Sequence, residues 1–187
     1  MIAERAGEML ILSGPPGAGK TTIAHALTTP CSVPAVHLHS DDFYHFIKHG
    51  YIAPYLPESN AQNQVVIEAV AAAALIYAKG GYFVVVDGIL GPWLLERFRA
   101  AIDVPLHYVV LRPDLRTTLA RAQGRNSDGL RETDPIRGLH QQFADLGDLE
   151  GHAIDTTAQS VPVTLNAVRE AVATGIACLP DDRACGN

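Results

Sequence analysis

The sequence predicts an α/β fold in which a five-stranded parallel sheet carries helices on both faces. Short apolar runs of strand length recur along the chain, and each run is followed by a longer segment with helical periodicity. Most of these runs are rich in Val, Ile and Leu, which is typical of strands buried on both faces. Because crossovers between parallel strands are right-handed, this alternation places helices on both sides of one sheet.

The expected elements follow this alternation in order. Strands are predicted over residues 9–13, 35–39, 82–87, 106–111 and 152–155. Helices are predicted over residues 20–27, 42–49, 61–79, 92–101, 114–123, 135–144 and 161–174. Two helix ends have local signals, since Gly80 follows Lys79 as a stop and Pro135 follows Asp134 as a first-turn proline behind an N-cap.

Length and charge limit the classes of partner. At 187 residues the chain has the usual size of one domain, which we expect over residues 1–179, with a polar tail over residues 180–187. A net charge of −6 repels polyanions over most of the surface. We therefore expect no extended nucleic-acid partner and no binding to an anionic membrane surface. Nothing in the sequence indicates an oligomeric state.

The cysteines and the apolar segments favour a cytoplasmic location. Cys31, Cys178 and Cys185 make an odd number and lack the spacing of metal ligands, so they do not form a complete disulfide framework. We expect no signal peptide, because the first eight residues contain charges and no long apolar run. We also expect no stretch with the roughly 18 apolar residues that are needed to span a bilayer.

A glycine-rich loop follows the first predicted strand. Its pattern is a glycine, four residues and then Gly-Lys-Thr, which is the phosphate-loop motif of proteins that bind nucleoside triphosphates. A strand leads into the loop and a helix leads out, so backbone N–H groups and the helix N-terminus can face phosphate oxygens. The residues expected to bind the nucleotide are Gly14, Pro15, Pro16, Gly17, Ala18, Gly19, Lys20, Thr21 and Thr22.

Two side chains of this loop have specific expected roles. Lys20 is expected to reach the β- and γ-phosphates and to act in catalysis. The hydroxyl of Thr21 is expected to take one position on Mg²⁺. An ordinary Gly/Pro-rich turn is the structural alternative, but the strand before the loop and the helix after it favour the phosphate loop.

Carboxylates follow the second and third predicted strands. Ligands of an open α/β sheet collect beyond the carboxyl ends of its strands, so these side chains should face the transferred phosphate. We assign Asp41 as the general base that accepts a proton from an attacking hydroxyl. Asp87 is the expected carboxylate that holds Mg²⁺ through water, and Asp42 competes for either role.

Structural explanations stay open for these residues. Either Asp42 or Ser40 can serve as the N-cap of the next helix, and Asp87 can belong to an Asp-Gly turn at the strand end. His39, beside the first of these turns, is a further candidate for contact with a substrate. Other polar and aromatic residues are interpreted as packing or surface residues, namely His37, His45, His49, Trp93 and Tyr108.

An arginine-rich segment follows the fourth predicted strand. It contains Arg112, Arg116, Arg121, Arg125, Arg131 and Arg137. Arg121 and Arg125 are four residues apart, so they share one face and can clamp phosphates if the helix continues that far. We predict a small lid over residues 121–134, in which both arginines are catalytic and Arg121 also binds the nucleotide. A solvated helix face is the structural alternative.

The order of these parts resembles the small phosphate-loop kinases, a group that contains nucleoside monophosphate, gluconate and shikimate kinases, chloramphenicol phosphotransferase and polynucleotide kinase. The run from Ser40 to Phe43 looks like the Asp-Asp-aromatic turn of polynucleotide kinase, and the segment from Leu111 to Arg125 is similar to the lid of this group. The nearest resemblance is to uncharacterised bacterial members labelled as cytidylate kinases. The resemblance implies a three-layer α/β/α fold with strand order 2-3-1-4-5, ATP as donor and Asp41 as base.

The acceptor region departs from the pattern of nucleotide kinases. Residues 43–64 should cover the acceptor and include His45, Lys48, Tyr51 and Tyr55, but they contain no arginine. Nucleoside monophosphate kinases normally hold the acceptor phosphate with arginines from this region. Their substitutes in this chain would be Arg97 and Arg99.

Three functions are compatible with these observations. The first is a phosphotransferase that moves the γ-phosphoryl group of Mg-ATP to a hydroxyl of a small molecule. The second is a nucleoside monophosphate kinase of the cytidylate type. The third belongs to another class, a nucleotide-dependent switch or regulatory ATPase. A phosphate loop combined with a lid favours the first, because phosphoryl transfer to an acceptor needs a site from which water is excluded.

Overall fold

A computed structural model of the chain describes residues 5–29, 31–124 and 130–180. Its sheet contains β1 (Met9–Ser13), β2 (Ala35–His39), β3 (Phe83–Asp87), β4 (Leu106–Leu111) and β5 (Ala153–Ile154). All neighbouring strands are parallel, and their order is β2-β3-β1-β4-β5. The predicted fold class and strand order are therefore confirmed.

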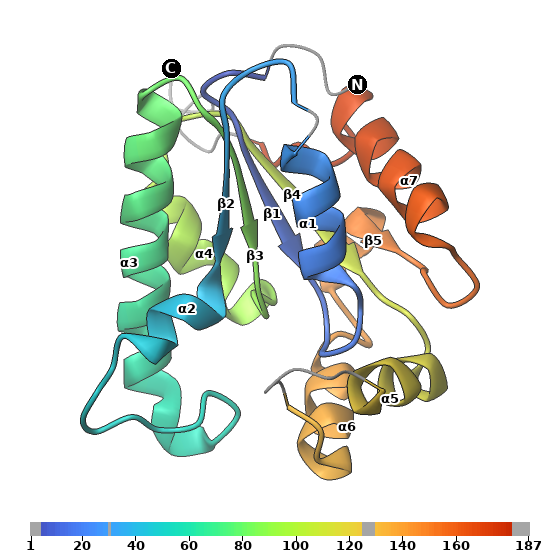
Figure 1. Cartoon of the computed structure of the whole chain (residues 1–187). Coiled ribbons are helices and arrows are strands. Elements are labelled where there is room, and N and C mark those ends of the chain that lie inside the picture. The colour runs from blue at the N-terminus through green and yellow to red at the C-terminus, as the bar shows by residue number, and fades with distance from the viewer. Residues whose placement is uncertain (1–4, 30, 125–129, 181–187) are drawn as a thin grey trace.

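Helices cover both faces of this sheet. They are α1 (Lys20–Thr28), α2 (Ser40–His45), α3 (Asn60–Lys79), α4 (Pro92–Ala100), α5 (Leu115–Gln123), α6 (Thr133–Gln142) and α7 (Val161–Ala173), with 3-10 turns η1 (Pro57–Ser59) and η2 (Gly147–His152). Figure 1 shows α1 and α7 on one face and α3 and α4 on the other, with α5 and α6 beyond the carboxyl ends of the strands.

The core consists of two apolar layers that share the strands. Successive residues of a strand point to opposite faces, so Met9 and Ile11 pack toward α3 and α4 while Leu10 and Leu12 pack toward α1 and α7. All four side chains are fully buried. Burial on both sides explains why the strands are continuous apolar runs rather than alternating ones.

Strand pairing brings the expected site residues to one edge. Asp87, the last residue of β3, pairs with Leu12 of β1 on one side and with His39 of β2 on the other. The phosphate loop after Ser13 and the carboxylates that follow β2 therefore start from the same end of the sheet.

Three elements differ from their predicted bounds by two or more residues in total, and the others differ by at most one. Helix α2 begins at Ser40 and ends at His45, and α6 begins at Thr133, so Pro135 is its third residue. Proline is tolerated there because the first N–H groups of a helix have no intrahelical partner. The last strand, predicted over residues 152–155, pairs with β4 only through Ala153 and Ile154, since 3-10 turn η2 extends to residue 152.

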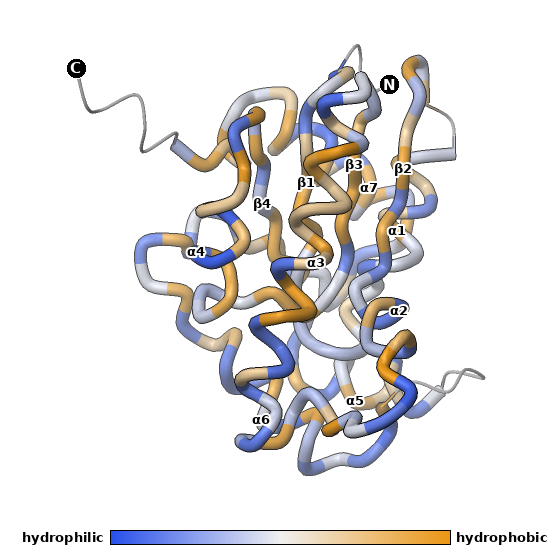
Figure 2. The backbone as a smooth tube through the Cα atoms, turned by 90° about the vertical axis from the view of Figure 1, so that its left-hand side faces the viewer, coloured by the Kyte–Doolittle hydropathy of each residue, from blue (hydrophilic) through white to orange (hydrophobic). Residues whose placement is uncertain are grey.

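Helix α3 is more apolar than expected. The helical segment Pro57–Lys79 is long and apolar enough to cross a membrane by length and composition, so the prediction that no stretch is this apolar was wrong. A core helix passes the same test, and α3 packs Val66, Val70 and Ala74 against the sheet. Figure 2 shows that hydrophobic residues are concentrated in the upper part of this helix, where alanines raise its hydropathy.

Candidate active site

The phosphate loop adopts a conformation that only glycine tolerates at several positions. Gly14, Gly17 and Gly19 have φ angles of 138°, 82° and 92°. A Cβ atom would lie 2.2 Å from the carbonyl oxygen of Leu111 at Gly14 and 2.5 Å from that of Thr118 at Gly17. The glycines therefore allow both the turn of the backbone and its close approach to the end of β4 and to the backbone of α5.

Lys20 lies across the loop that precedes it. Its Nζ donates to the carbonyl oxygens of Gly14 at 2.9 Å and Pro15 at 3.0 Å, and the residue is only 8% exposed. Gly19 occupies the N-cap position of α1, which has no side-chain cap. The ammonium group of Lys20 and the first N–H groups of α1 thus lie together at the N-terminus of this helix, where an anion can bind.

The buried carboxylate of Asp87 is hydrogen-bonded to two partly or fully exposed side chains. Its Oδ2 accepts from the Thr21 hydroxyl at 2.6 Å, and its Oδ1 lies 2.6 Å from Nε2 of His37. Burial raises the pKa of a carboxyl, but the hydrogen bonds from His37 and Thr21 outweigh this and lower the pKa of Asp87. The side chain is therefore ionised at neutral pH although it is fully buried.

Thr21 and Asp87 have the chemistry of a magnesium site completed by a nucleotide. Among the described residues, no group of three or more His, Cys, Asp or Glu side chains could hold a metal ion by itself. Mg²⁺ in phosphoryl-transfer sites uses one or two oxygen ligands from the protein together with phosphates and water. A hydroxyl and a carboxylate at the phosphate-binding end fit this requirement.

Asp41 and Asp42 occupy the first turn of α2 and differ in what they face. Their side chains are 59% and 64% exposed, and the ring of His39 lies 3.6 Å from Asp41 and 3.5 Å from Asp42. His39 takes the N-cap position without a side-chain cap bond, so neither Ser40 nor Asp42 is the cap. Asp41 lines the adjacent cleft and Asp42 does not.

A cleft of about 820 Å³ opens beside Asp41. It runs between α2, α3, α4 and α6 and the segment that connects α2 with α3. Its lining comprises Ser40, Asp41, Tyr44, His45, Tyr51, Ala53, Pro54, Tyr55, Leu56, Pro57, Ser59, Asn60, Asn63, Ile67, Ile89, Trp93, Leu94, Leu130, Glu132, Leu139 and Gln142. Ser40, one of these residues, lies against Gly88, where an added Cβ atom would be 2.0 Å from the Ser40 hydroxyl. The cleft thus adjoins the turn that carries Asp87.

Amide side chains at the start of α3 hold one wall of the cleft. Gln62 makes hydrogen bonds to both the N–H and the carbonyl of Ile52, at 2.9 and 2.7 Å. Asn63 donates to the carbonyl of Pro54 at 2.8 Å and accepts from the hydroxyl of Tyr44 at 3.1 Å. These bonds tie the connecting segment to α3, so the wall is built before any ligand binds.

The predicted arginines do not gather at the cleft in the described residues. Arg121 donates to the carbonyl of Thr156 at 3.0 Å, and α5 ends at Gln123. Arg125, part of the predicted lid, lies outside the described residues. Arg97 pairs with Glu68, and neither Arg97 nor Arg99 lines the cleft. The suggestion that these two arginines replace the usual acceptor-binding ones was therefore wrong.

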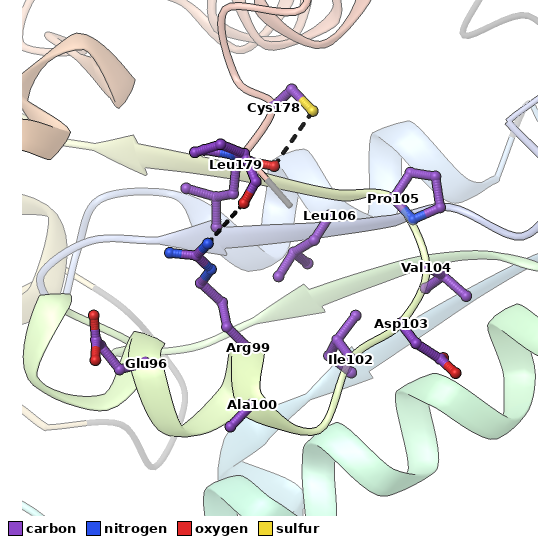
Figure 3. A pocket seen from close by; sticks show the side chains of 11 residues that line it. Glu96, Arg99, Ala100, Ile102, Asp103, Val104, Pro105, Leu106, Cys178 and Leu179 are labelled. Carbon is purple, nitrogen blue, oxygen red and sulfur yellow. Dashed lines mark hydrogen bonds between the residues drawn. The ribbon is translucent and has the colours of Figure 1, made fainter. Parts of the chain in front are cut away.

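Arg99 belongs to a second pocket, of about 590 Å³, at the opposite end of β4 (Figure 3). Its guanidinium donates to the carbonyl of Pro180 at 2.7 Å, and the first residue of β4, Leu106, lines the same pocket. Because β4 begins there, this pocket lies away from the phosphate loop and takes no part in the candidate active site.

Sequence reasoning missed three residues of the site. His37, interpreted as packing, binds Asp87, and Trp93 and Glu132 line the cleft. A signal existed for Trp93, since it stands in the first turn of a helix that follows a strand end. His37 gave none, because its partner Asp87 lies 50 residues away along the chain. Glu132 gave none, because the cleft that it lines is formed mainly by residues 40–94.

The comparisons with known proteins agree with this geometry. A family model described as an AAA domain matches residues 9–146. The chain belongs to this family. The match covers the phosphate loop, the carboxylates after β2 and β3, and the helices α5 and α6. A search of curated proteins finds no match.

Solved structures of similar fold include kinases. A sugar kinase from Janibacter sp. superposes with a TM-score of 0.65 at 17% identity, covering 91% of this chain and 98% of the other. For the tunicamycin resistance protein of Deinococcus radiodurans the TM-score is 0.62 at 16% identity, covering 93% and 99%. Further matches are described as a gluconokinase, a shikimate kinase, a thymidylate kinase and an APS kinase.

One further match is to a chain of a larger assembly, of which this protein spans less than half. The Pnkp1/Rnl/Hen1 RNA repair complex gives a TM-score of 0.59 at 18% identity over 73% of this chain, and the chain spans 44% of the matched one. These matches show a phosphate-loop kinase fold that implies the use of a nucleotide, usually with Mg²⁺. The fold of this chain resembles those of small-molecule kinases as well as nucleotide kinases.

Proposed function

We propose that the protein is an ATP-dependent phosphotransferase that moves the γ-phosphoryl group of Mg-ATP to a hydroxyl of a small molecule. One observation carries this proposal: Asp41 faces a formed cleft that adjoins the phosphate-binding end of the sheet. A kinase needs a second site beside the phosphates with a base at its inner end. A site that serves only nucleotide hydrolysis has no use for such a cleft.

The proposed reaction uses residues of both regions. Asp41 accepts the proton of the acceptor hydroxyl while the hydroxyl oxygen bonds to the γ-phosphorus and the bond to the β–γ bridging oxygen breaks. ADP leaves with the negative charge of that oxygen, which Lys20 and the loop N–H groups stabilise. Mg²⁺ would be held by Thr21 and, through water, by Asp87, where it would neutralise charge on the β- and γ-phosphates.

Arg121 and Arg125 complete the proposal as lid residues. Arg121 lies in the last turn of α5. The same helix approaches the phosphate loop, since the carbonyl oxygen of Thr118 lies close to Gly17. To contact the nucleotide, the Arg121 guanidinium would have to release the carbonyl oxygen of Thr156, to which it donates at 3.0 Å. A positively charged lid stabilises the transferring group and excludes water.

Two other functions serve as the alternatives to be tested. A nucleoside monophosphate kinase of the cytidylate type would transfer the phosphoryl group to a phosphate, and Asp41 would then orient the acceptor without deprotonating it. A regulatory ATPase would hydrolyse ATP without any acceptor.

The test is ATP consumption with Mg²⁺ across a panel of alcohols, sugars, sugar acids and nucleoside monophosphates. The phosphorylated acceptor is identified by ³¹P NMR, and wild type is compared with Asp41→Asn and with Asp42→Asn as matched control. We expect a hydroxyl compound to stimulate turnover and, of the two variants, Asp41→Asn alone to lower this turnover by about 10²-fold while ATP still binds. Stimulation by nucleoside monophosphates alone, or hydrolysis that no acceptor changes, would refute the proposal.

A further inference from the structure

The charges that face the acceptor cleft are negative. Among the described residues that line it, Asp41 and Glu132 are carboxylates, none is Lys or Arg, and His45 is the sole side chain that can become a cation. Lys48 lies nearby in the chain but is not in the lining, and its ammonium donates to the carbonyl of His45. An anionic group in this cleft would meet like charge at close range.

The walls of the cleft present exposed aromatic rings. Tyr51, Tyr55 and Trp93 keep 51%, 40% and 47% of their surface exposed although they line a concave site. The ring of Trp93 packs edge-on against Phe143, with centroids 5.3 Å apart, and it leaves no room for a side chain at Gly91. These contacts set the orientation of the ring, and its exposed part can contact a ligand in the cleft.

The tyrosine hydroxyls keep their protons in this environment. Burial and the charge of Asp41 raise the pKa of Tyr44, and the same two causes, with Tyr55, raise that of Tyr51. Tyr44 donates to Asn63 as part of the wall. Tyr51 can therefore act as a neutral donor to a ligand, which favours polar but uncharged acceptor groups.

We infer that the acceptor is a ring-bearing alcohol that carries no negative charge. This inference rests on the proposed function and narrows its acceptor class. A flat ring would lie against Trp93 or the tyrosines, with its hydroxyl directed to Asp41, which lines the same cleft. Sugar acids, nucleotides and other anionic acceptors are disfavoured by Asp41 and Glu132, and a positively charged substituent is tolerated.

Binding is measured first, independently of transfer. Trp93 is the single tryptophan of the chain, so its fluorescence reports occupancy of the cleft. Titrations use matched pairs that differ in charge, namely cytidine and cytidine 5′-monophosphate, adenosine and adenosine 5′-monophosphate, and a phenicol-type alcohol and its succinate ester. We expect the neutral members to bind more tightly by about fivefold or more, the effect of one like charge at about 4 Å in water. Equal or tighter binding of the anionic members overturns the inference, as does a failure of every neutral member to bind.

A charge variant tests the cause of this discrimination. Glu132→Gln should strengthen binding of the anionic members by about fivefold and leave the neutral members unchanged. Glu96→Gln, which removes the same charge from an exposed residue of the second pocket, is the matched control and should change neither. Unchanged binding of anions to Glu132→Gln overturns the inference.

Transfer to the bound compounds separates this inference from the proposed function. If a neutral member binds but Mg-ATP does not phosphorylate it, the proposed function fails while the ligand class stands. If an anionic member is phosphorylated in preference, the kinase function stands and the inferred acceptor class fails.

Discussion

The two halves of the candidate site are built in opposite ways. The phosphate-binding half is one continuous segment, residues 14–21, in which backbone geometry and a single lysine provide most of the chemistry. The acceptor half consists of side chains that come from residues 40 to 142 and meet only in the folded chain. The first is nearly invariant in its requirements, whereas the second can change acceptor by changing a few side chains.

The difference teaches where specificity resides in such a fold. A Cβ atom at Gly14 or Gly17 would meet a backbone carbonyl, so the phosphate loop cannot vary without moving β4 or α5. The rings of Tyr51 and Tyr55 are partly exposed and belong to no core cluster, so each can be replaced with little disturbance of the core. Changes in the two halves should therefore have separable effects on ATP and on the acceptor.

The largest effect is expected from Lys20→Met. Loss of the ammonium group from the β- and γ-phosphates should lower kcat by about 10³-fold, the cost of removing one strong donor from a transition-state site. Lys79→Met is the control, since Lys79 lies on the surface and pairs with Asp103. Steady-state kinetics should show near wild-type turnover for the control, and a kcat for Lys20→Met within tenfold of wild type would contradict the assignment.

The next largest effect is expected from Asp41, which lines the acceptor cleft. Asp41→Asn should lower kcat/KM for the acceptor by about 10²-fold, as expected for loss of a general base. Asp42→Asn, one residue away but outside the cleft, should change it by less than about threefold on the same basis. Comparable losses in both variants would show that the charge of the first turn, and not a base at Asp41, matters. The dissociation constant of ATP should be similar in all three proteins.

A smaller effect is expected from His37 of β2, which is hydrogen-bonded to Asp87 at the phosphate-binding end of the sheet. His37→Leu removes a hydrogen bond from the buried Asp87 and should raise the Mg²⁺ concentration for half-maximal activity by about tenfold. His37→Gln can restore a donor and should recover part of this loss. Mg²⁺ titration at saturating ATP and acceptor makes the measurement, with thermal unfolding as a check on folding. An unchanged Mg²⁺ requirement in His37→Leu would remove His37 from the site.

The smallest effect should be confined to the acceptor. Tyr51→Leu should raise the KM of the acceptor by about fivefold, since an aromatic contact contributes about 1 kcal/mol beyond its buried area. The KM of ATP and kcat should stay unchanged. Tyr77→Leu, a partly exposed tyrosine of α3 that packs against Tyr82 outside the cleft, is the matched control. An equal change in the KM of ATP would mean that the two halves are not separable.

Much of the fold could be predicted because its determinants are local. Apolar runs, glycine stops and the phosphate-loop motif each lie within a few consecutive residues, and the strand order followed from the resemblance to small kinases. The starts of α2 and α6 were misplaced by two residues, because first-turn acidic residues and Pro135 are tolerated at more than one position of a helix start. The bounds of α3 were predicted to within one residue, but its apolar length was underestimated.

By itself the sequence determined the anion-binding loop, the parallel sheet and the placement of Asp41 and Asp87 at strand ends. These features depend on backbone conformation and on continuous apolar runs, which adjacent residues specify. Only the tertiary structure decided that His37 binds Asp87, that Asp41 rather than Asp42 faces the cleft, and that Trp93 and Glu132 line it. Such contacts join segments far apart in the chain, and their geometry depends on how the helices pack on the sheet.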